Sequence, residues 1–307
     1  MIIHVRRKSF TIVEMMVVIA IVGILMGMML PALGKARTRA KYVRWLAFNA
    51  QNNRDPDTII NYNFEAMDFQ AKIKGTYYPV LYNGAIACNA PGYDPAAYNG
   101  ILSTTATTAA AKKNPANYPQ WVRGGGRWMG MKNTLQFNGT NNYVDIPGTD
   151  SLNFDPSKND FTVLLWVNFN STGTRCLFGK NYTLTGNSQY DLYLSGTYIS
   201  SRIGNASLQR RVPVISRANW YNIAVVNKAK TGVKMYVNGA LMTGGTAKPA
   251  LPSSYLVNAN LLLGASHSGA TGAGRANFFA GRMDEFVMFG RALSDKEIQG
   301  QYKMGMP

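Results

Sequence analysis

The chain has 307 residues and a formal net charge of +17, and 46% of its residues are hydrophobic while only 15% are charged. This balance excludes an intrinsically disordered chain, which combines low apolar content with a high charge fraction. Two His and two Cys are too few for a four-ligand zinc site or a disulfide framework, whereas 17 Tyr, 13 Phe and 30 Gly favour a β-rich fold with many turns.

The first thirty residues predict a basic leader followed by a single membrane-spanning helix. Residues 1–9 contain Arg6, Arg7 and Lys8 and no acid, and residues 10–30 are almost entirely apolar. A helix over residues 10–30 is roughly 31 Å long, about the thickness of a bilayer core. Because basic residues stay in the cytoplasm, we expect the C-terminal end of this helix to point outward.

One acid, Glu14, lies inside the apolar run. A lone carboxylate in a bilayer costs about 2.5–3.5 kcal/mol on insertion scales, so we expect Glu14 to have a partner or to lie close to the interface. An ordinary secretory signal would be followed by a small-residue cleavage site, and the segment MMLPAL at 28–33 has no A-x-A pattern.

The segment KSFTIVEMMVVIAIVGILMGMMLPAL resembles the N-terminal signal of type IV pilins and type II secretion pseudopilins. The resemblance implies cleavage by prepilin peptidase between Ser9 and Phe10 and N-methylation of Phe10, with Ser9 in place of the usual Gly. It implies that Glu14 meets the N-terminal amine of the next pilin or pseudopilin subunit. Gly23 and Pro31 match the helix glycine and kinking proline of many pilins, and Pro31 predicts a kink or local melting.

The signal resemblance also predicts a location: a single-pass protein of the bacterial inner membrane, with its domain in the periplasm and assembly into a pilus or pseudopilus. The chain then divides into a cleaved leader (1–9), a long helix (10–54) and a globular domain (55–307).

Residues 32–53 predict that the helix continues beyond the membrane, until Asp55-Pro56 ends it. The apolar residues of this part form a stripe near helical spacing, which predicts the face that docks on the domain. They are Tyr42, Val43, Leu46, Ala47 and Ala50. The same part carries five cations and no acid: Lys35, Arg37, Arg39, Lys41 and Arg44. We expect these cations either to contact lipid headgroups, neighbouring subunits or an anionic polymer, or to form a solvated face of the helix.

Beyond residue 55, short β-type runs alternate with Gly, Asn, Pro and Ser clusters. Asn238-Gly239 predicts a type I′ hairpin, and the segment 294–297, SDKE, is a capping box that opens a helix. The predicted strands are Thr58–Phe64, Thr134–Phe137, Tyr143–Ile146, Phe161–Phe169, Arg175–Gly179, Tyr190–Leu194, Tyr198–Arg202, Tyr221–Asn227, Gly232–Val237 and Phe278–Phe289.

These runs, in this order, resemble the laminin-G-like, concanavalin A-like jelly roll, most specifically in LLLGAS (261–266) and FAGRMDEFVMFGRALSDKEI (279–298). The resemblance covers about residues 57–305. It implies a mainly β fold, with two antiparallel sheets packed face to face behind one long N-terminal helix. It also implies a domain that binds carbohydrate, other glycans or protein.

The same resemblance implies a calcium site. Asp284 of the G-x-x-D-E strand would ligate calcium together with oxygens of the F-N-G turn, at Asn138 and Gly139. Alternatively, Asp284 caps a loop or pairs with Arg282 or Arg291.

Three aromatic residues in or near predicted loops, Trp128, Tyr182 and Tyr190, are candidate ligand contacts. After export, Cys88 and Cys176 would be in an oxidising compartment that permits a disulfide. The sequence alone leaves open whether the two cysteines meet.

The sequence argues against an enzyme. Glycoside hydrolases need two carboxylates about 5–5.5 or 6.5–9.5 Å apart. Asp284 and Glu285 are adjacent on a predicted strand, so we expect them to point to opposite faces. The two His are His4 in the leader and His267 in a Gly/Ser-rich loop, so no nucleophile–base arrangement can be assembled.

Three functions compete. The first is a pilin-like or pseudopilin-like subunit that displays a lectin-type domain binding carbohydrate or another surface ligand. The second is a nucleic-acid-binding minor pilin for DNA uptake, since residues 45–307 carry 24 Lys+Arg against 14 Asp+Glu. These cations are scattered, however, and would equally suit an acidic polysaccharide. The third is a membrane-anchored adhesin that does not assemble.

Overall fold

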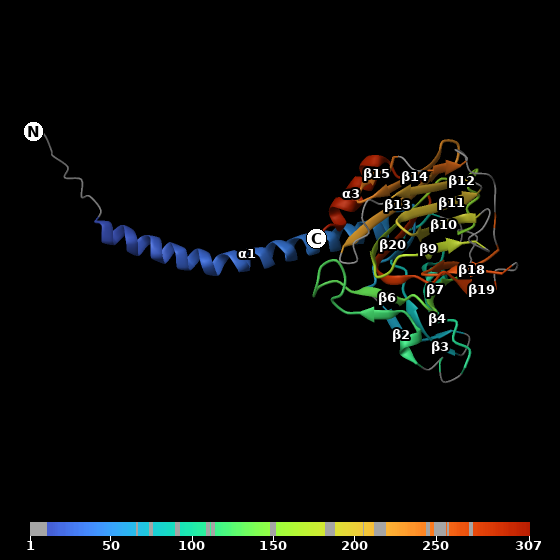
Figure 1. The fold of residues 1–307 in the computed structure, drawn as a ribbon, viewed down its shortest axis with the longest axis horizontal. Helices are drawn as coiled ribbons and strands as arrows, with labels where there is room; N and C mark the ends of the chain where they lie inside the picture. The colour runs from blue at the N-terminus through green and yellow to red at the C-terminus, as the bar shows by residue number, and fades with distance from the viewer. Residues whose placement is uncertain are drawn as a thin grey trace, which may run out of the picture.

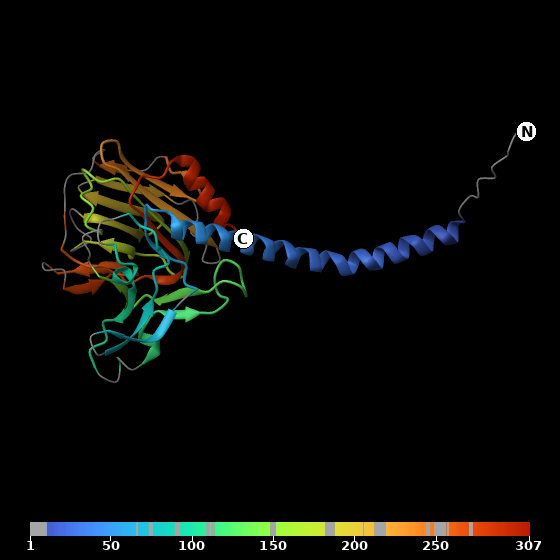
Figure 2. The same ribbon diagram turned by 180° about the vertical axis from the view of Figure 1, so that it is seen from behind.

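The computed structural model describes residues 11–65, 67–73, 76–89, 93–108, 111, 114–147, 152–181, 188–204, 206–211, 219–243, 246–248, 256, 258–269 and 273–307. Helix α1 (Ile12–Arg54) projects from a domain of β-sheets, with the N-terminus at its far end (Figures 1 and 2). Helix α3 (Asp295–Gly305) lies against the domain where α1 joins it. The predicted order, one long apolar helix and then a β domain, is confirmed.

Within the described residues the strands form two large antiparallel sheets and a small hairpin. The eight-stranded sheet has the order β15-β14-β13-β8-β20-β6-β5, with β1 also pairing with β20, and the ten-stranded sheet has the order β16-β12-β11-β10-β9-β17-β7-β4-β3-β2. The strands are β1 (Thr58–Tyr62), β2 (Met67–Ile73), β3 (Thr76–Leu81), β4 (Gly100–Thr104), β5 (Gln120–Val122), β6 (Thr134–Asn138), β7 (Asn142–Ile146), β8 (Phe161–Phe169), β9 (Arg175–Lys180), β10 (Ser188–Ser195), β11 (Tyr198–Gly204), β12 (Ala206–Arg211), β13 (Trp220–Lys228), β14 (Gly232–Val237), β15 (Ala240–Leu241), β16 (Thr246–Lys248), β17 (Leu261–Leu263), β18 (Ser266–Ser268), β19 (Gly274–Ala276) and β20 (Ala280–Phe289).

The main core lies between the two large sheets. Phe178 on β9 meets Phe286 on β20 with ring centroids 5.6 Å apart, and Phe161 on β8 meets Tyr190 on β10 at 5.3 Å. These contacts join the inner faces of the two sheets, as in a jelly-roll sandwich. The predicted fold class is therefore confirmed.

A second apolar layer covers the outer face of the eight-stranded sheet. Leu293 and Ile298, at and near the start of α3, pack on Leu164 and Val226 of the sheet. Every residue of β8 is buried, since one face of the strand meets the core and the other meets the helices. This explains why β8 is apolar on both faces over residues 163–167 rather than alternating.

Local signals in the sequence were accurate where they depend on short-range chemistry. Asn238 and Gly239 have φ of +53° and +73°, the left-handed conformations that a type I′ turn requires. Ser294 and Glu297 form the predicted capping box at α3. Strands β8 and β14 have the predicted bounds, and α1 ends at Arg54, directly before Asp55-Pro56, as predicted.

Pro31 lies inside α1, where we predicted a kink or local melting. The helix continues through Pro31 without local melting, and Figures 1 and 2 show that its axis changes direction along its length. A proline removes one backbone hydrogen bond, and a helix this long retains enough others on either side to remain continuous.

Candidate functional site

The N-terminal half of α1 presents an apolar surface that nothing in the described chain covers. From Ile12 to Leu33 every residue is exposed, and an apolar window of this helix is 0% buried. Among the described residues, α1 is the one helix long and apolar enough to cross a membrane. A Cβ added to Gly23 or Gly27 would meet no atom of the described chain outside its own helical turn within 4 Å, so this face is open to a neighbouring helix or to lipid.

Glu14 lies in a capping box at the start of α1. Its Oε2 accepts hydrogen bonds from the backbone N–H and the hydroxyl of Thr11, at 2.8 and 2.9 Å. The carboxylate therefore has a partner within its own chain, which the sequence interpretation did not anticipate. Ser9 and Phe10, the predicted cleavage and methylation residues, lie outside the described residues.

The C-terminal part of α1 docks on the domain through a face that includes Tyr42 of the predicted apolar stripe but not the other residues of that stripe. Trp45, Asn49 and Asn52 are buried, whereas Val43 of the predicted stripe is 55% exposed. The asparagines make specific amide hydrogen bonds: Asn49 Oδ1 accepts from Asn61 at 2.9 Å, and Asn52 exchanges two bonds with Gln301 of α3. The interface is therefore aromatic and polar, which hides it from a search for apolar periodicity.

Trp45 lies at the centre of an aromatic and cationic cluster. Its ring packs on Trp128 with centroids 5.4 Å apart, and its indole N–H donates to Oε1 of Glu285. Lys132 Nζ lies 4.0 Å from the centroid of the Trp45 ring, and the Arg127 guanidinium lies 4.2 Å from that of Trp166. Such cation–π contacts strengthen when they are desolvated, as they are here.

Buried ion pairs complete this cluster, which we call the Trp45 socket: Trp45, Glu65, Arg127, Trp128, Lys132, Trp166, Asp284 and Glu285. Lys132 Nζ lies 2.7 Å from Asp284 Oδ1, and Arg127 Nη1 lies 3.0 Å from Glu285 Oε2. The backbone N–H of Arg127 donates to Asp284 Oδ2 at 2.6 Å.

The socket also perturbs two more exposed groups, its member Glu65 and the neighbouring Tyr42. Burial raises the pKa of Glu65, although the ammonium of Lys132 opposes this. Burial, together with the charges of Glu65 and Asp284, raises the pKa of Tyr42 to about 12. Both shifts follow from carrying charge in a site with little water.

The structure contradicts the predicted calcium ligand set. Asp284 is fully buried and its carboxylate is neutralised by Lys132 and Arg127. Asn138 pairs with Ala280, four residues earlier on β20 and roughly 13 Å along the strand, so the two sites are separate. Gly139 is a turn residue with φ of +75°, where an added Cβ would lie 2.6 Å from that of Ala280.

The expectation that Asp284 and Glu285 point to opposite faces is also wrong. Met283 pairs with Val167 and Glu285 pairs with Trp166, which leaves Asp284 as the extra residue of a β-bulge. The bulge breaks the alternation of the strand, so both carboxylates reach Arg127. A Cβ on Gly126 would lie 2.8 Å from Asp284 Oδ2, so glycine permits this close approach.

The predicted ligand-contact aromatics are structural where the structure describes them. Trp128 is 1% exposed and packs in the Trp45 socket. Tyr190 is 1% exposed, and its hydroxyl donates to the carbonyl of Leu152 at 3.0 Å. Tyr182 lies outside the described residues. Cys88 and Cys176 are not joined by a disulfide, and the Cys176 thiol donates to the carbonyl of Phe178 at 3.3 Å.

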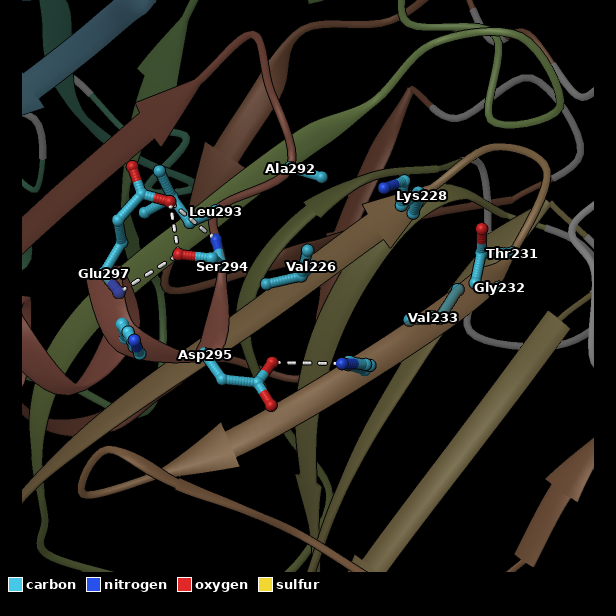
Figure 3. A pocket seen from close by; sticks show the side chains of 12 residues that line it. Val226, Lys228, Thr231, Gly232, Val233, Ala292, Leu293, Ser294, Asp295 and Glu297 are labelled. Carbon is cyan, nitrogen blue, oxygen red and sulfur yellow. Dashed lines mark hydrogen bonds and ion pairs between the residues drawn. The ribbon is translucent and has the colours of Figure 1, made fainter.

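Within the part of the chain that the structure describes, a groove beside the start of α3 is a candidate for ligand binding. It has a volume of about 610 Å³ and lies between this helix and β14 (Figure 3). This size is within the range of small-molecule sites in proteins. The floor is formed by Val226, Val233 and Leu293, and the rim carries Lys228, Lys234 and Lys296.

The charges of this groove are unequally satisfied. Asp295 pairs with Lys234 at 3.0 Å and accepts from the Tyr236 hydroxyl at 2.6 Å, and Figure 3 shows the first of these contacts. Among the described residues, Lys228 and Lys296 are exposed and make no ion pair. Asn222 pairs with Trp166 beside the Trp45 socket, and Lys228 follows six residues later on the same strand, roughly 20 Å farther. The groove lies near the C-terminal end of α1, because Glu297 in its lining pairs with Arg291, which also pairs with Asp55 at the end of this helix. It is therefore remote from the exposed apolar half of α1.

A second polar cluster lies on the outer face of the ten-stranded sheet. Asp191 and Arg202 form an ion pair there, and Asn181 donates to Asp191 at 2.9 Å. All three residues are at most 6% exposed. Because a ligand cannot reach them in this conformation, the groove beside α3 is the better candidate.

Comparisons with known proteins agree with this architecture. Residues 5–30 match the prokaryotic N-terminal methylation motif, and residues 138–299 match the concanavalin A-like lectin/glucanases superfamily. No curated protein matches the chain significantly.

Solved structures with a similar arrangement include toxin binding domains. The receptor-binding domain of botulinum neurotoxin C/D mosaic serotype has 12% identity and a TM-score of 0.48, over 80% of this chain and 51% of that one. The binding domain of Paraclostridial Mosquitocidal Protein 1 has 15% identity and a TM-score of 0.45, over 66% and 51%. The chain thus spans about half the length of these structures.

The superfamily match extends over more than half of the chain and includes β20 and the start of α3. The fold has the two packed antiparallel sheets expected of it. The chain therefore belongs to the concanavalin A-like lectin/glucanase superfamily, carried behind a prokaryotic N-terminal methylation segment.

Proposed function

We propose that the protein is a pilin-like or pseudopilin-like subunit that holds a glycan-binding domain outside the bacterial inner membrane. The observation that carries this proposal is the division of α1 into two parts. Ile12–Leu33 is apolar and bare, whereas Trp45, Asn49 and Asn52 are fixed in the domain. Because the helix is fixed in the domain at one end, its location in a bilayer or filament sets the location of the domain.

Processing follows from the methylation motif. Prepilin peptidase cleaves between Ser9 and Phe10 and the new amine is methylated. In a pilus or a type II secretion pseudopilus, Glu14 of one subunit then pairs with the amine of the next, exchanging its Thr11 bonds for an intermolecular contact. Recovery in sheared filaments supports assembly, and recovery solely in the membrane fraction favours a non-assembling anchored adhesin.

We place the glycan in the groove beside α3. An apolar floor with a few polar groups on its rim is the usual build of a ligand site. Lys228 and Lys296 favour a glycan that carries carboxylate or sulfate groups, since an ammonium attracts anions. The groove is remote from the exposed apolar half of α1 that lies in the membrane, so an extracellular polymer has access to it.

A glycan array with the full chain in non-ionic detergent tests this placement. We expect binding to acidic glycans, its loss in K228Q/K296Q, and its retention in K158Q/K303Q, which removes two exposed lysines outside the groove. Equal loss in both variants would contradict a groove-specific site. Binding of duplex DNA that falls steeply with salt, without glycan binding, would favour nucleic-acid uptake instead.

A further inference from the structure

We propose that three basic residues of α1, Lys35, Arg37 and Arg39, bind the anionic lipid headgroups of the leaflet that faces the domain. We call these three residues the basic collar. All three are exposed, and among the described residues none of them forms an ion pair. No acidic residue occurs in α1 after Glu14. The collar therefore carries uncompensated positive charge.

The position of the collar along the helix matches the headgroup layer. Ile12 to Leu33 gives roughly 33 Å of apolar helix, close to the thickness of a bilayer core. Lys35 and Arg39 lie roughly 3 and 9 Å beyond Leu33 along the axis. With the apolar segment in the membrane, the collar lies at the depth of the lipid phosphates.

The distribution of the cations around the helix favours lipid over a protein partner. Successive residues of an α-helix are about 100° apart, so Arg39 lies about 40° from Lys35, whereas Arg37 lies on the opposite side. Headgroups surround a membrane helix on all sides, but a partner protein contacts one face. A second copy of α1 would bring like charges together at this level.

Leader removal increases the importance of the collar. The leader holds Arg6, Arg7 and Lys8, and after cleavage the remaining cations of the helix all follow Leu33. This inference rests on the membrane position of α1 in the proposed function. Each Lys or Arg near an anionic surface contributes about fivefold in affinity, so three residues give roughly a hundredfold preference.

The test uses the full chain in non-ionic detergent, titrated with phosphatidylglycerol and with phosphatidylcholine, with bound lipid counted by native mass spectrometry. We expect the wild type to retain phosphatidylglycerol in preference, and K35Q/R37Q/R39Q to lose most of that preference. The matched control R54Q/K158Q/K230Q removes the same charge from exposed positions away from the collar and should keep it. The preference should weaken as salt rises.

Several results would overturn the inference. They are equal binding of both lipids by the wild type, equal loss in the two triple variants, and displacement of the lipid by inorganic phosphate at equal concentration. Binding of a polyglutamate peptide at the collar without lipid preference would assign it to an acidic protein segment instead. Membrane anchoring is tested separately, because failure of the wild type to enter nanodiscs of either lipid would refute the proposed function.

Discussion

Substitution of Trp45 by Ala should release the C-terminal part of α1 from the domain. The side chain is 1% exposed, it packs on Trp128, and its indole N–H donates to Glu285. Truncation of a buried Trp costs about 3–5 kcal/mol, and loss of a hydrogen bond to a charged acceptor accounts for about 1.5–3 kcal/mol of such a cost. W45F should therefore cost roughly half as much free energy as W45A, since it keeps an aromatic ring but removes the hydrogen-bond donor.

Hydrogen exchange of the full chain in non-ionic detergent measures this directly. In W45A, amides 45–53 should exchange much faster, whereas β8 and β20 should remain protected. V43A is the control, because Val43 lies two residues away on the same helix and is 55% exposed. If amides 45–53 are as well protected in W45A as in V43A, the Trp45 socket does not hold the helix and the domain together.

Three other predictions concern single charged groups. D284N should destabilise the chain by about 3–5 kcal/mol, because it removes the carboxylate nearest to buried Lys132 and leaves Glu65, at 3.4 Å, as the counter-ion. Its melting temperature should fall equally in calcium and in chelator; a calcium-dependent stabilisation present only in the wild type would restore the metal-ligand hypothesis. Burial lowers the pKa of Lys180 to about 8, so the folded state resists protonation of this amine. The contribution of this amine to stability should therefore rise from pH 8 to 10.5, by roughly 3 kcal/mol at most, and it is measured as the difference between wild type and K180M in thermal melts, where the tyrosine contributions cancel; a difference that does not change with pH would refute it. E14A should insert into membranes yet fail to enter filaments, and E14Q, which can still cap Thr11, should fail as well if the charge is needed; filament entry by E14Q alone would assign Glu14 to capping.

The sequence predicted the elements whose signals are local. The apolar run of α1, the type I′ turn at Asn238-Gly239 and the capping box at Ser294 each depend on a few neighbouring residues. Strand β8 was equally clear, because burial on both faces gives it nine consecutive residues that fit a sheet interior. These features require no knowledge of the partner strands.

The Trp45 socket could not be predicted, since it joins α1, the segment around Arg127 and strand β20. Alternation along β20 placed Asp284 and Glu285 on opposite faces, and the bulge that brings them together leaves no mark in the sequence. The run GGGRW at 124–128 was the available signal, because consecutive glycines permit backbone to approach a buried carboxylate closely. Most of the docking face of α1 was missed because asparagines, rather than aliphatic residues, form much of it.

The central claim is that the chain is processed and anchored as a pilin-type subunit, and mass spectrometry of the N-terminus of the envelope-bound protein tests it most directly. The account predicts a mature chain that begins at Phe10 and carries one methyl group on its amine, with the whole of α1 retained. A mature chain beginning near Ala32 would show ordinary signal-peptide removal, the loss of the apolar half of α1, and no pilin-type assembly.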